Sequence, residues 1–527
     1  MAERDITGAS IALIDGDDIV WSAGFGYTNR SSKVKVTGDT LFHVGSISKS
    51  FTALGALKAV AKNRIALDDP LKKYLPWFFV NSRFGAAAVE QITIRHLLAH
   101  HSGLGTWSPL GNPSDTAYHT RTFEEVVKST SGSWLKAPAG ERFEYSNQGI
   151  DLAGYTLAVV SGTTFENFMR EEILVPLGMT TSTFNQPQAT AKETCVTGYL
   201  GKRSVPIVNG VVMPLVAAGG LFASANDLAR FIIFHLQTGA ANGKQILPAT
   251  LLKEMYVPQF TAQNQISGYG LGIYKALQND TVRLSHGGLG YGISTHYRFL
   301  PEYRLGVVLL TNQDTAHNAP HLASRVIELM LTAKLQRSPK NNSVSTAEKP
   351  IASLSEKFLR RFEGTYLLYE GLLFRFRYEN GGLFHITGNE KLKLVSLSPT
   401  EFVSGSRLYK FMLDENGRPI GVQIIDGYYD PQTAENSVVY LPVNDTPMDA
   451  QGLRKSEWSR LTGKYAGTFI GVNSEVKVSL VNGHLYLNDK LKLKESLSNS
   501  FVSADGEAVI FSGKQLSVGN KLYLRKE

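Results

Sequence analysis

The feature that most limits how this chain of 527 residues can fold is a change of pattern about two thirds of the way along it. Residues 338–353 are polar, contain two prolines and show no apolar period, which is typical of a linker. Before this segment, helix and strand patterns alternate. After it, short strand-like runs are separated by Asn-Gly and Asp-Gly turns. We therefore predict a mixed domain over residues 1–337, a linker over 338–353 and all-β structure from residue 354 onward.

The all-β part contains an internal repeat with a spacing of about 99 residues. The matching segments are FEGTY at 362–366 with LTGKY at 461–465, KLKL at 391–394 with KLKL at 490–493, and FVS at 402–404 with FVS at 501–503. Two related modules are the simplest explanation, and we place them at residues 354–445 and 450–527. Closing each sheet into a small barrel, lipocalin-like in form, would leave no exposed strand edges.

The first 337 residues carry a strand hairpin at each end. Runs of β-forming residues at 9–14 and 19–23 flank an Asp-Gly-Asp-Asp turn, and runs at 294–300 and 304–311 flank a Pro-Glu-Tyr turn. A helical pattern follows at 321–335, and further helical patterns lie between the hairpins. We therefore predict an α/β (α+β) domain whose single antiparallel sheet is assembled from both ends of the domain and is flanked by helices.

Composition excludes several classes of partner. Lys and Arg total 54 against 46 Asp and Glu, a formal charge of +8 without the cluster that a nucleic-acid surface requires. Apolar runs fall short of the 18 or more residues of a membrane span. The N-terminus has no basic, apolar leader, so we expect a cytoplasmic protein, or a periplasmic or secreted one if a signal peptide preceded this numbering. Cys195 is the only cysteine, which excludes an internal disulfide and argues against a cysteine-built metal site.

The strongest chemical pattern is Gly-Ser-Ile-Ser-Lys-Ser at residues 45–50, where a helical period begins. Positions three apart share a helix face, so Lys49 can reach the hydroxyl of Ser46. The positive end of the helix dipole favours negative charge on that serine, and a partly desolvated lysine can act as its base. Chance occurrence of Ser-x-x-Lys, with Ser46 serving as a helix cap, is the alternative.

Two further patterns carry polar groups suited to the same chemistry. Tyr145-Ser-Asn147 supplies a phenol that can relay protons and an amide that can hold a substrate. Ser-His-Gly-Gly-Leu-Gly at 285–290 supplies His286, and its glycines, Gly288 among them, allow a substrate backbone to approach a strand closely. The alternatives are a packed tyrosine and a glycine-rich turn with an incidental histidine.

Taken in this order and at these distances, the three patterns resemble the Ser-x-x-Lys, Tyr-x-Asn and (Lys/His)-x-Gly elements of the serine β-lactamase and penicillin-binding-protein family. The resemblance covers roughly residues 5–335 and implies a β-lactamase/transpeptidase-like catalytic domain. It implies that Ser46 is the acylated nucleophile, with Lys49 and Tyr145 as base and proton relay.

The same resemblance assigns the substrate side of the site. Asn147 would position the substrate, and the backbone N–H groups of Ser46 and Leu289 would form the oxyanion hole. His286 stands where β-lactamases usually carry a lysine that recognises a carboxylate. A histidine with an ordinary pKa near 6.5 offers a hydrogen bond more than a charge at pH 7, which directs the prediction away from substrates that end in a carboxylate.

The whole layout is similar to that of the D-aminopeptidases of this family, in which two β-barrel domains follow the catalytic domain. We therefore predict a serine hydrolase without metal or other cofactor that acts through an acyl-enzyme on a small-molecule or short peptide substrate, and that can assemble as a homo-oligomer. Two alternatives stay open: a carboxylic esterase with weak β-lactamase activity, and a penicillin-binding sensor or scaffold without turnover.

Other patterns carry no prediction of function. His96 and His100 lie four residues apart on a predicted helix, but no carboxylate completes a metal site. The Gly-Tyr-Gly-Leu-Gly run at 268–272 lacks the spacing and the preceding strand of a dinucleotide-binding loop.

Overall fold

The computed structural model describes residues 6–336 except 32, 83, 112–120, 142, 201–204, 207–214, 261–266, 279–280, 291 and 314–317. Beyond them it describes 354–367, 373–387, 390–404, 407–413, 417, 419–426, 438–442, 461–469, 472–481, 484–487, 491–497, 500–503, 508–512, 515–518 and 521–525. The predicted linker at 338–353 lies outside the described residues, as does the segment 443–460 in which the two C-terminal modules are predicted to meet. The domain boundaries therefore stay predictions.

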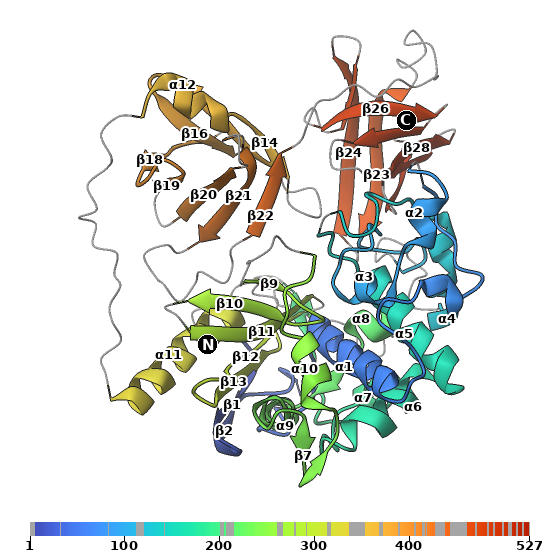
Figure 1. Cartoon of the computed structure of the whole chain (residues 1–527), viewed down its shortest axis with the longest axis vertical. Coiled ribbons are helices and arrows are strands. Elements are labelled where there is room, and N and C mark those ends of the chain that lie inside the picture. The colour runs from blue at the N-terminus through green and yellow to red at the C-terminus, as the bar shows by residue number, and fades with distance from the viewer. Residues whose placement is uncertain are drawn as a thin grey trace. The chain divides into compact units, whose positions relative to one another are not determined.

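A seven-stranded antiparallel sheet forms the centre of the N-terminal part (Figure 1). Its strands, in spatial order, are β2 (Asp18–Gly26), β1 (Gly8–Asp15), β13 (Leu305–Thr311), β12 (Ile293–Leu300), β11 (Thr281–Gly290), β10 (Tyr274–Gln278) and β9 (Gly268–Tyr269). The first strand pairs with the last, as in Ala12↔Val308. The predicted assembly of one sheet from the two ends of the domain is therefore confirmed.

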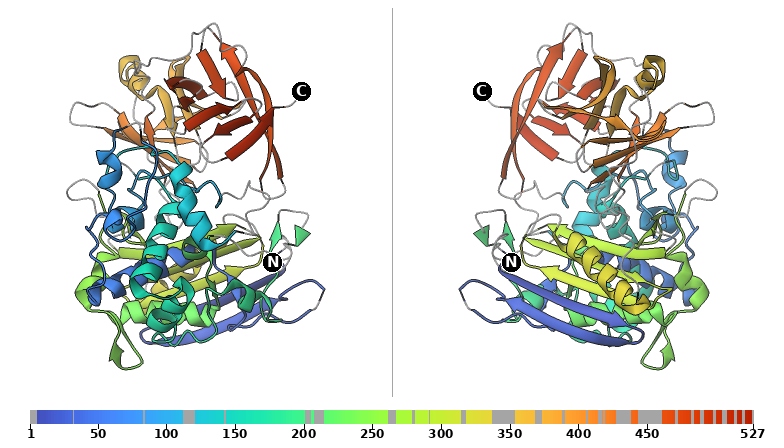
Figure 2. Two further views of the ribbon diagram at one scale, coloured as in Figure 1. Left: turned by 90° about the vertical axis from the view of Figure 1, so that its right-hand side faces the viewer. Right: turned by 90° about the vertical axis from the view of Figure 1, so that its left-hand side faces the viewer.

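Both faces of this sheet are covered by helices. Neighbouring residues of β1 point to opposite faces, so Ala12 belongs to the main core while Ile11 packs in a smaller cluster with Ala323 and Ile327 of α11. Figure 2 shows α11 (Asn318–Leu335) lying along one face. The main helices of the opposite face are α1 (Ser48–Ala61), α5 (Asn147–Ser161), α8 (Val216–Gly219) and α9 (Ala225–Leu236).

Shorter elements connect these layers. They are α2 (Ala87–Glu90), α3 (Ile94–Leu98), α4 (Phe123–Lys128), α6 (Phe165–Met169), α7 (Gln186–Thr190), α10 (Ala249–Glu254) and the strand pairs β3 (Phe42–His43) with β6 (Phe222–Ala223), β4 (Tyr199–Leu200) with β5 (Val205–Pro206), and β7 (Ala240–Ala241) with β8 (Lys244–Gln245). Within the described ranges, every helix is too short or too polar to pass through a bilayer.

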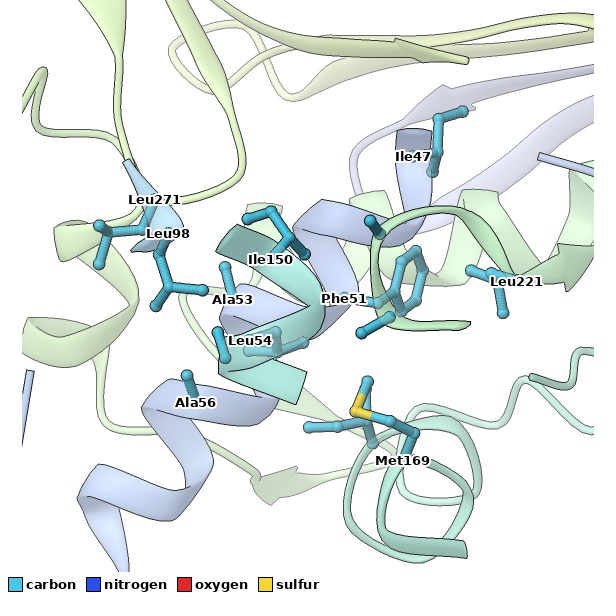
Figure 3. Close-up of a cluster of buried hydrophobic side chains, with 14 of the residues drawn as sticks. Ile47, Phe51, Ala53, Leu54, Ala56, Leu98, Ile150, Met169, Leu221 and Leu271 are labelled. Carbon is cyan, nitrogen blue, oxygen red and sulfur yellow. The ribbon is translucent and has the colours of Figure 1, made fainter. Parts of the chain in front are cut away.

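The helix α1 is buried on nearly all sides. Phe51 and Leu54 pack in one cluster with Ile150 of α5 and with Leu221 (Figure 3). Each large apolar side chain that is fully buried contributes about 1.5–3 kcal/mol to stability. A helix enclosed in this way has little freedom to move, so the residues at its N-terminus are held in fixed positions.

The first C-terminal module is a nine-stranded antiparallel sheet that follows a short helix, α12 (Glu356–Leu359), which the sequence does not predict. Its strands, in spatial order, are β17 (Glu390–Lys393), β16 (Gly382–Thr387), β15 (Leu373–Glu379), β14 (Gly364–Leu367), β22 (Val438–Pro442), β21 (Pro419–Asp426), β20 (Arg407–Leu413), β19 (Glu401–Ser404) and β18 (Val395–Ser396). Its interior is filled by aromatic rings, among them Phe362, Phe376, Phe402 and Phe411.

The second module has eight strands in chain order, and β23 also pairs with β30 through Tyr465↔Arg525. They are β23 (Gly463–Phe469), β24 (Val472–Val481), β25 (His484–Leu487), β26 (Leu491–Leu497), β27 (Ser500–Ser503), β28 (Ala508–Ser512), β29 (Gln515–Val518) and β30 (Lys521–Arg525). The two FVS segments lie in β19 and β27, which agrees with the repeat. In the described residues both modules are all-β apart from α12 and the turn that follows it, and the barrel form of the two modules stays a prediction.

Candidate active site

Ser46 lies on a tight turn that leads directly into α1. Residues Gly45–Ile47 form a 3-10 turn, so the serine precedes the α-helix and its side chain does not cap it. Gly45 has φ +54°, which favours glycine, and a Cβ atom there would lie 3.3 Å from the carbonyl oxygen of Leu289. The turn therefore allows strand β11 to approach the serine closely. The helix-cap alternative for Ser46 is wrong.

Lys49 stands in the first turn of α1 and is fully buried. Its Nζ donates to the Oγ of Ser46 at 2.9 Å and to the carbonyl oxygen of Ala218 at 2.8 Å. The three-residue spacing thus gives the direct contact that the sequence predicts.

Tyr145 reaches the same serine from a segment that lies about 100 residues further along the chain. Its hydroxyl donates to the Oγ of Ser46 at 2.8 Å, and the Nζ of Lys49 lies 4.9 Å from the centre of its ring. One hydroxyl oxygen therefore faces an amine and a phenol together. Both groups would stabilise negative charge on that oxygen when its proton leaves.

A buried carboxyl group on α5 holds the segment that contacts Lys49. The Oδ1 of Asp151 accepts from the backbone N–H groups of Ala217 and Ala218, at 3.0 and 2.9 Å. Burial raises the pKa of Asp151 to about 7, although the charge of Lys49 opposes this rise. Asp151 is not among the residues predicted from the sequence. A single acid inside the apolar segment 150–157 is the signal that could have revealed it.

Asn147 is the first residue of α5, two residues beyond Tyr145. The side chain of Ser146 caps the helix, and the N–H of Asn147 donates to the carbonyl oxygen of Thr106 at 2.9 Å. These contacts fix the backbone at the start of the helix. The predicted contact of Asn147 with substrate stays a prediction.

Strand β11 forms the other wall of the site. A Cβ atom on Gly288 would lie 2.0 Å from the carbonyl oxygen of Val44, so only glycine fits there. Pairing with β10 ends at Tyr274↔Ser285, whereas pairing with β12 continues to Gly290↔Ile293. The edge of β11 beyond Ser285 is therefore not covered by β10, and the side chain of Leu289 on it is 51% exposed.

The position of His286 differs from the expectation. Its Nε2 accepts from the hydroxyl of Tyr269 at 3.0 Å, and its Nδ1 donates to the carbonyl oxygen of Gly287 at 2.8 Å. Burial, together with the charge of Lys49, lowers the pKa of His286 to about 3, so the ring is neutral at pH 7. Both ring nitrogens are already engaged within the protein. The predicted hydrogen bond from this ring to a substrate is therefore not available in this arrangement.

Tyr269 belongs to the glycine-rich run at 268–272, for which the sequence predicts no function. From the sequence, His100 is rejected as a metal ligand beside His96, and it belongs to the run at 100–104, which resembles the same family without a role assigned to the histidine. The helix α3 ends at Leu98, however, and His100 lies beyond it with φ +60°, so the two histidines do not share a helix face. Its ring instead lies 4.3 Å, centre to centre, from that of Tyr145.

Comparison with known families and curated proteins gives matches to the N-terminal part. Residues 1–330 match the family model described as Beta-lactamase. Protein flp of Staphylococcus aureus (strain COL) is 26% identical over 314 residues, which is 59% of this chain and 61% of that protein. The match therefore spans about three fifths of the length of that relative.

Solved structures of similar fold extend further along the chain. The octameric penicillin-binding protein homologue from Pyrococcus abyssi is similar with a TM-score of 0.55 and 24% identity, over 84% of this chain and 97% of that one. The structure of SurE with D-Leu is similar with a TM-score of 0.55 and 21% identity, over 84% and 96% of the two chains. At these identities the likeness shows the fold alone.

Proposed function

The chain belongs to the Beta-lactamase family, and from this premise we propose that it is a serine hydrolase that works through an acyl-enzyme on Ser46. The observation that carries the proposal is the pair of hydrogen bonds that Lys49 and Tyr145 donate to the Oγ of Ser46. Such convergence on one hydroxyl is the arrangement that nucleophile activation requires.

In the proposed reaction, the proton of Ser46 passes to the Lys49–Tyr145 pair while Oγ bonds to the substrate carbonyl carbon. The resulting oxyanion accepts hydrogen bonds from the N–H groups of Ser46 and Leu289. Collapse of this intermediate breaks the bond to the amine or alcohol, which leaves with the proton. Water then attacks the acyl-enzyme by the same steps and releases the acid.

We assign the substrates to small amides and esters without a carboxylate at the docking strand. His286, which occupies the third motif, is neutral and buried, so it offers no permanent positive charge to a carboxylate. Peptidase activity on D-aminoacyl compounds is the preferred form, since the layout is similar to that of D-aminopeptidases and a protein of similar fold has been solved with D-Leu. The exposed, apolar Leu289 favours a carboxylic esterase as the second candidate.

The test is a substrate screen with D- and L-aminoacyl p-nitroanilides, p-nitrophenyl esters and nitrocefin. We expect turnover of the anilides or esters by the natural protein and none by Ser46→Ala. Turnover that persists in Ser46→Ala would overturn the mechanism. Labelling with fluorescent penicillin distinguishes a hydrolase from a penicillin-binding sensor without turnover. The sensor would stay labelled, whereas a hydrolase releases the label or never takes it up.

We further propose that the chain forms a homo-oligomer, since the penicillin-binding protein homologue from Pyrococcus abyssi, which is similar in fold, is octameric. We also propose that both C-terminal modules are barrels that shape access to the site. Light scattering on the purified chain measures the oligomeric state, and a monomeric mass would contradict the first of these proposals.

A further inference from the structure

We propose that His100 is a positioning residue for Tyr145: it holds the chain on both sides of that tyrosine so that the phenol stays against the Oγ of Ser46. The inference rests on the proposed function, in which Tyr145 takes part in proton transfer. His100 lies outside the three motifs and follows α3 at a distance of 45 residues from Tyr145 in the sequence.

Two hydrogen bonds from one residue fix the backbone on either side of Tyr145. The carbonyl oxygen of His100 accepts from the N–H of Glu144 at 2.7 Å. The Nδ1 of its ring accepts from the N–H of Ser146 at 3.1 Å. The N–H groups of the residues before and after the tyrosine are thereby bound to one residue, which restricts rotation of the backbone that carries the phenol.

The ring of His100 also packs against the tyrosine itself. The two ring centres are 4.3 Å apart, and the ring of Tyr269 lies 4.9 Å from His100 on a further contact. Because the imidazole is fully buried, it blocks movement of the half-buried Tyr145 ring towards the side on which His100 lies. Tyr269 in turn donates to His286, so His100 also connects the second motif with the third.

The protonation state of His100 suits this role. An Nδ1 that accepts an N–H must be unprotonated, so the hydrogen is on Nε2. Burial lowers the pKa of His100 well below its usual value, and the charge of Lys49 lowers it further. The tyrosines that pack on the ring, Tyr145 and Tyr269, carry no positive charge. The acceptor is therefore retained at neutral pH.

Two features of His100 are unfavourable in themselves. Its φ of +60° lies in the left-handed region, which is uncommon for residues other than glycine, and its buried Nε2 has no hydrogen-bond partner among the described residues. Strain and unsatisfied groups of this kind occur mainly where a site depends on them. Here the candidate site depends on the Nδ1 contact with Ser146 and on the ring contact with Tyr145.

The test compares variants that keep or lose the Nδ1 contact. In His100→Asn the side-chain oxygen occupies the place of Nδ1, and asparagine tolerates a positive φ, although the ring contact is lost. We expect the hydrogen bond to Ser146 to matter more than the ring contact, so kcat should stay within about 3-fold. In His100→Gly the backbone is relaxed and the bond to Glu144 can remain, but the ring and its acceptor are lost. We expect kcat to fall about 30- to 100-fold with KM changed less than about 3-fold, because a misplaced proton-transfer group slows chemistry more than binding.

His101→Ala is the matched control, since His101 is a buried neighbour whose Nδ1 bonds to the carbonyl oxygen of Ala99 instead. It should change kcat by less than about 3-fold. The pH profile of kcat/KM should shift in His100→Gly and not in His100→Asn or His101→Ala, since only the first releases Tyr145.

A fourth variant decides the question if His100→Gly fails to fold. His100→Gln has its amide carbon, which accepts no hydrogen bond, in the place of Nδ1, and its amide oxygen and nitrogen lie one bond further from the backbone. It should be as slow as the glycine variant, and a glutamine variant as fast as His100→Asn would overturn the proposal. Normal kcat in His100→Gly would also overturn it, whereas the proposed function fails separately, through activity in Ser46→Ala.

Discussion

The two walls of the candidate site use their polar groups in opposite ways. On the helical wall, formed by α1 and the start of α5, the side chains of Lys49 and Tyr145 both point at the Oγ of Ser46. On the strand wall, formed by β11, the only titratable side chain of the motif is turned into the protein: His286 bonds to Tyr269 and to its neighbour's carbonyl oxygen. What the strand offers is backbone and the exposed Leu289.

This difference separates chemistry from selection. Groups that converge on the nucleophile act on every substrate, so their loss should lower kcat for all classes alike. A strand that presents backbone groups and no charge can bind any acyl group of suitable shape. Such a strand discriminates mainly against substrates with a carboxylate, because it has no positive charge to bind one. Changes on the helical wall should therefore abolish activity, and changes on the strand wall should alter the ratio between substrates.

The largest effect is expected for Ser46→Ala. Because Ser46 is the proposed nucleophile, we expect kcat/KM to fall by about 1,000-fold or more on every substrate that the natural protein turns over. Its hydroxyl does not cap α1, so the melting temperature should change by only a few degrees. Parallel kinetics and thermal unfolding measure both. Loss of only one substrate class would show that the two walls are not separate in function.

Lys49→Arg should have the next largest effect. Arginine keeps a positive charge but cannot supply a neutral amine, and its larger head must fit where Nζ is fully buried. We expect kcat to fall about 100- to 1,000-fold, nearly as far as in Lys49→Ala. Single-turnover rates with a p-nitrophenyl ester measure the acylation step directly. A near-normal arginine variant would contradict a role for Lys49 as base.

The helical wall was partly predictable because its first contact is local. A spacing of three residues brings Lys49 to Ser46 in any helix that begins at this point, and the hairpins at 9–23 and 294–311 are equally local patterns. The contact of Tyr145 with the same serine spans 99 residues and could be predicted only from the resemblance to a family.

The side-chain contacts of the strand wall were not predictable, because they too join residues that are distant in the sequence. The partner of His286 is Tyr269, which reaches it because two short strands, β9 and β10, fold back beside β11. Neither that register nor the contacts of His100 can be predicted from the nearby sequence, and the signal for Asp151 is only a single acid within an apolar segment. Tertiary contacts set the protonation state of His286, so its ordinary pKa was a poor guide to how it would be used.

His286→Lys tests the strand wall and should alter preference more than rate. A lysine would add a compact positive charge at a buried position of the proposed docking strand, where a charge pair is worth more than the ~1 kcal/mol of an exposed pair. We expect kcat/KM for substrates with a carboxylate, penicillins included, to rise a few-fold to about 100-fold relative to neutral esters. An unchanged ratio would place His286 away from the substrate carboxylate.

The pH dependence of the natural protein supplies the control. A histidine whose pKa is about 3 stays neutral when the pH falls from 8 to 5, so it gains no charge over that range. For the natural protein, the ratio of kcat/KM for carboxylate substrates to kcat/KM for neutral substrates should therefore not change between pH 8 and pH 5. A ratio that rose towards pH 5 would mean that His286 titrates near its ordinary value and is not held by Tyr269.

Removal of the C-terminal modules should have the smallest effect on either wall. The repeats share glycine, aromatic and Lys-Leu positions and no nucleophile–base pair. The first module's interior is filled by rings such as Phe376 and Phe411, which pack in a cluster of their own. The catalytic part has a separate core that includes Phe51 and Leu54, so a chain ending at Ser338 should fold.

The kcat of this shortened chain on the best substrate should stay within about 3-fold, while the range of accepted substrates broadens. The substrate screen described above measures both the rate and the range of substrates. An unchanged range of substrates would assign the modules to partner binding or oligomerisation instead.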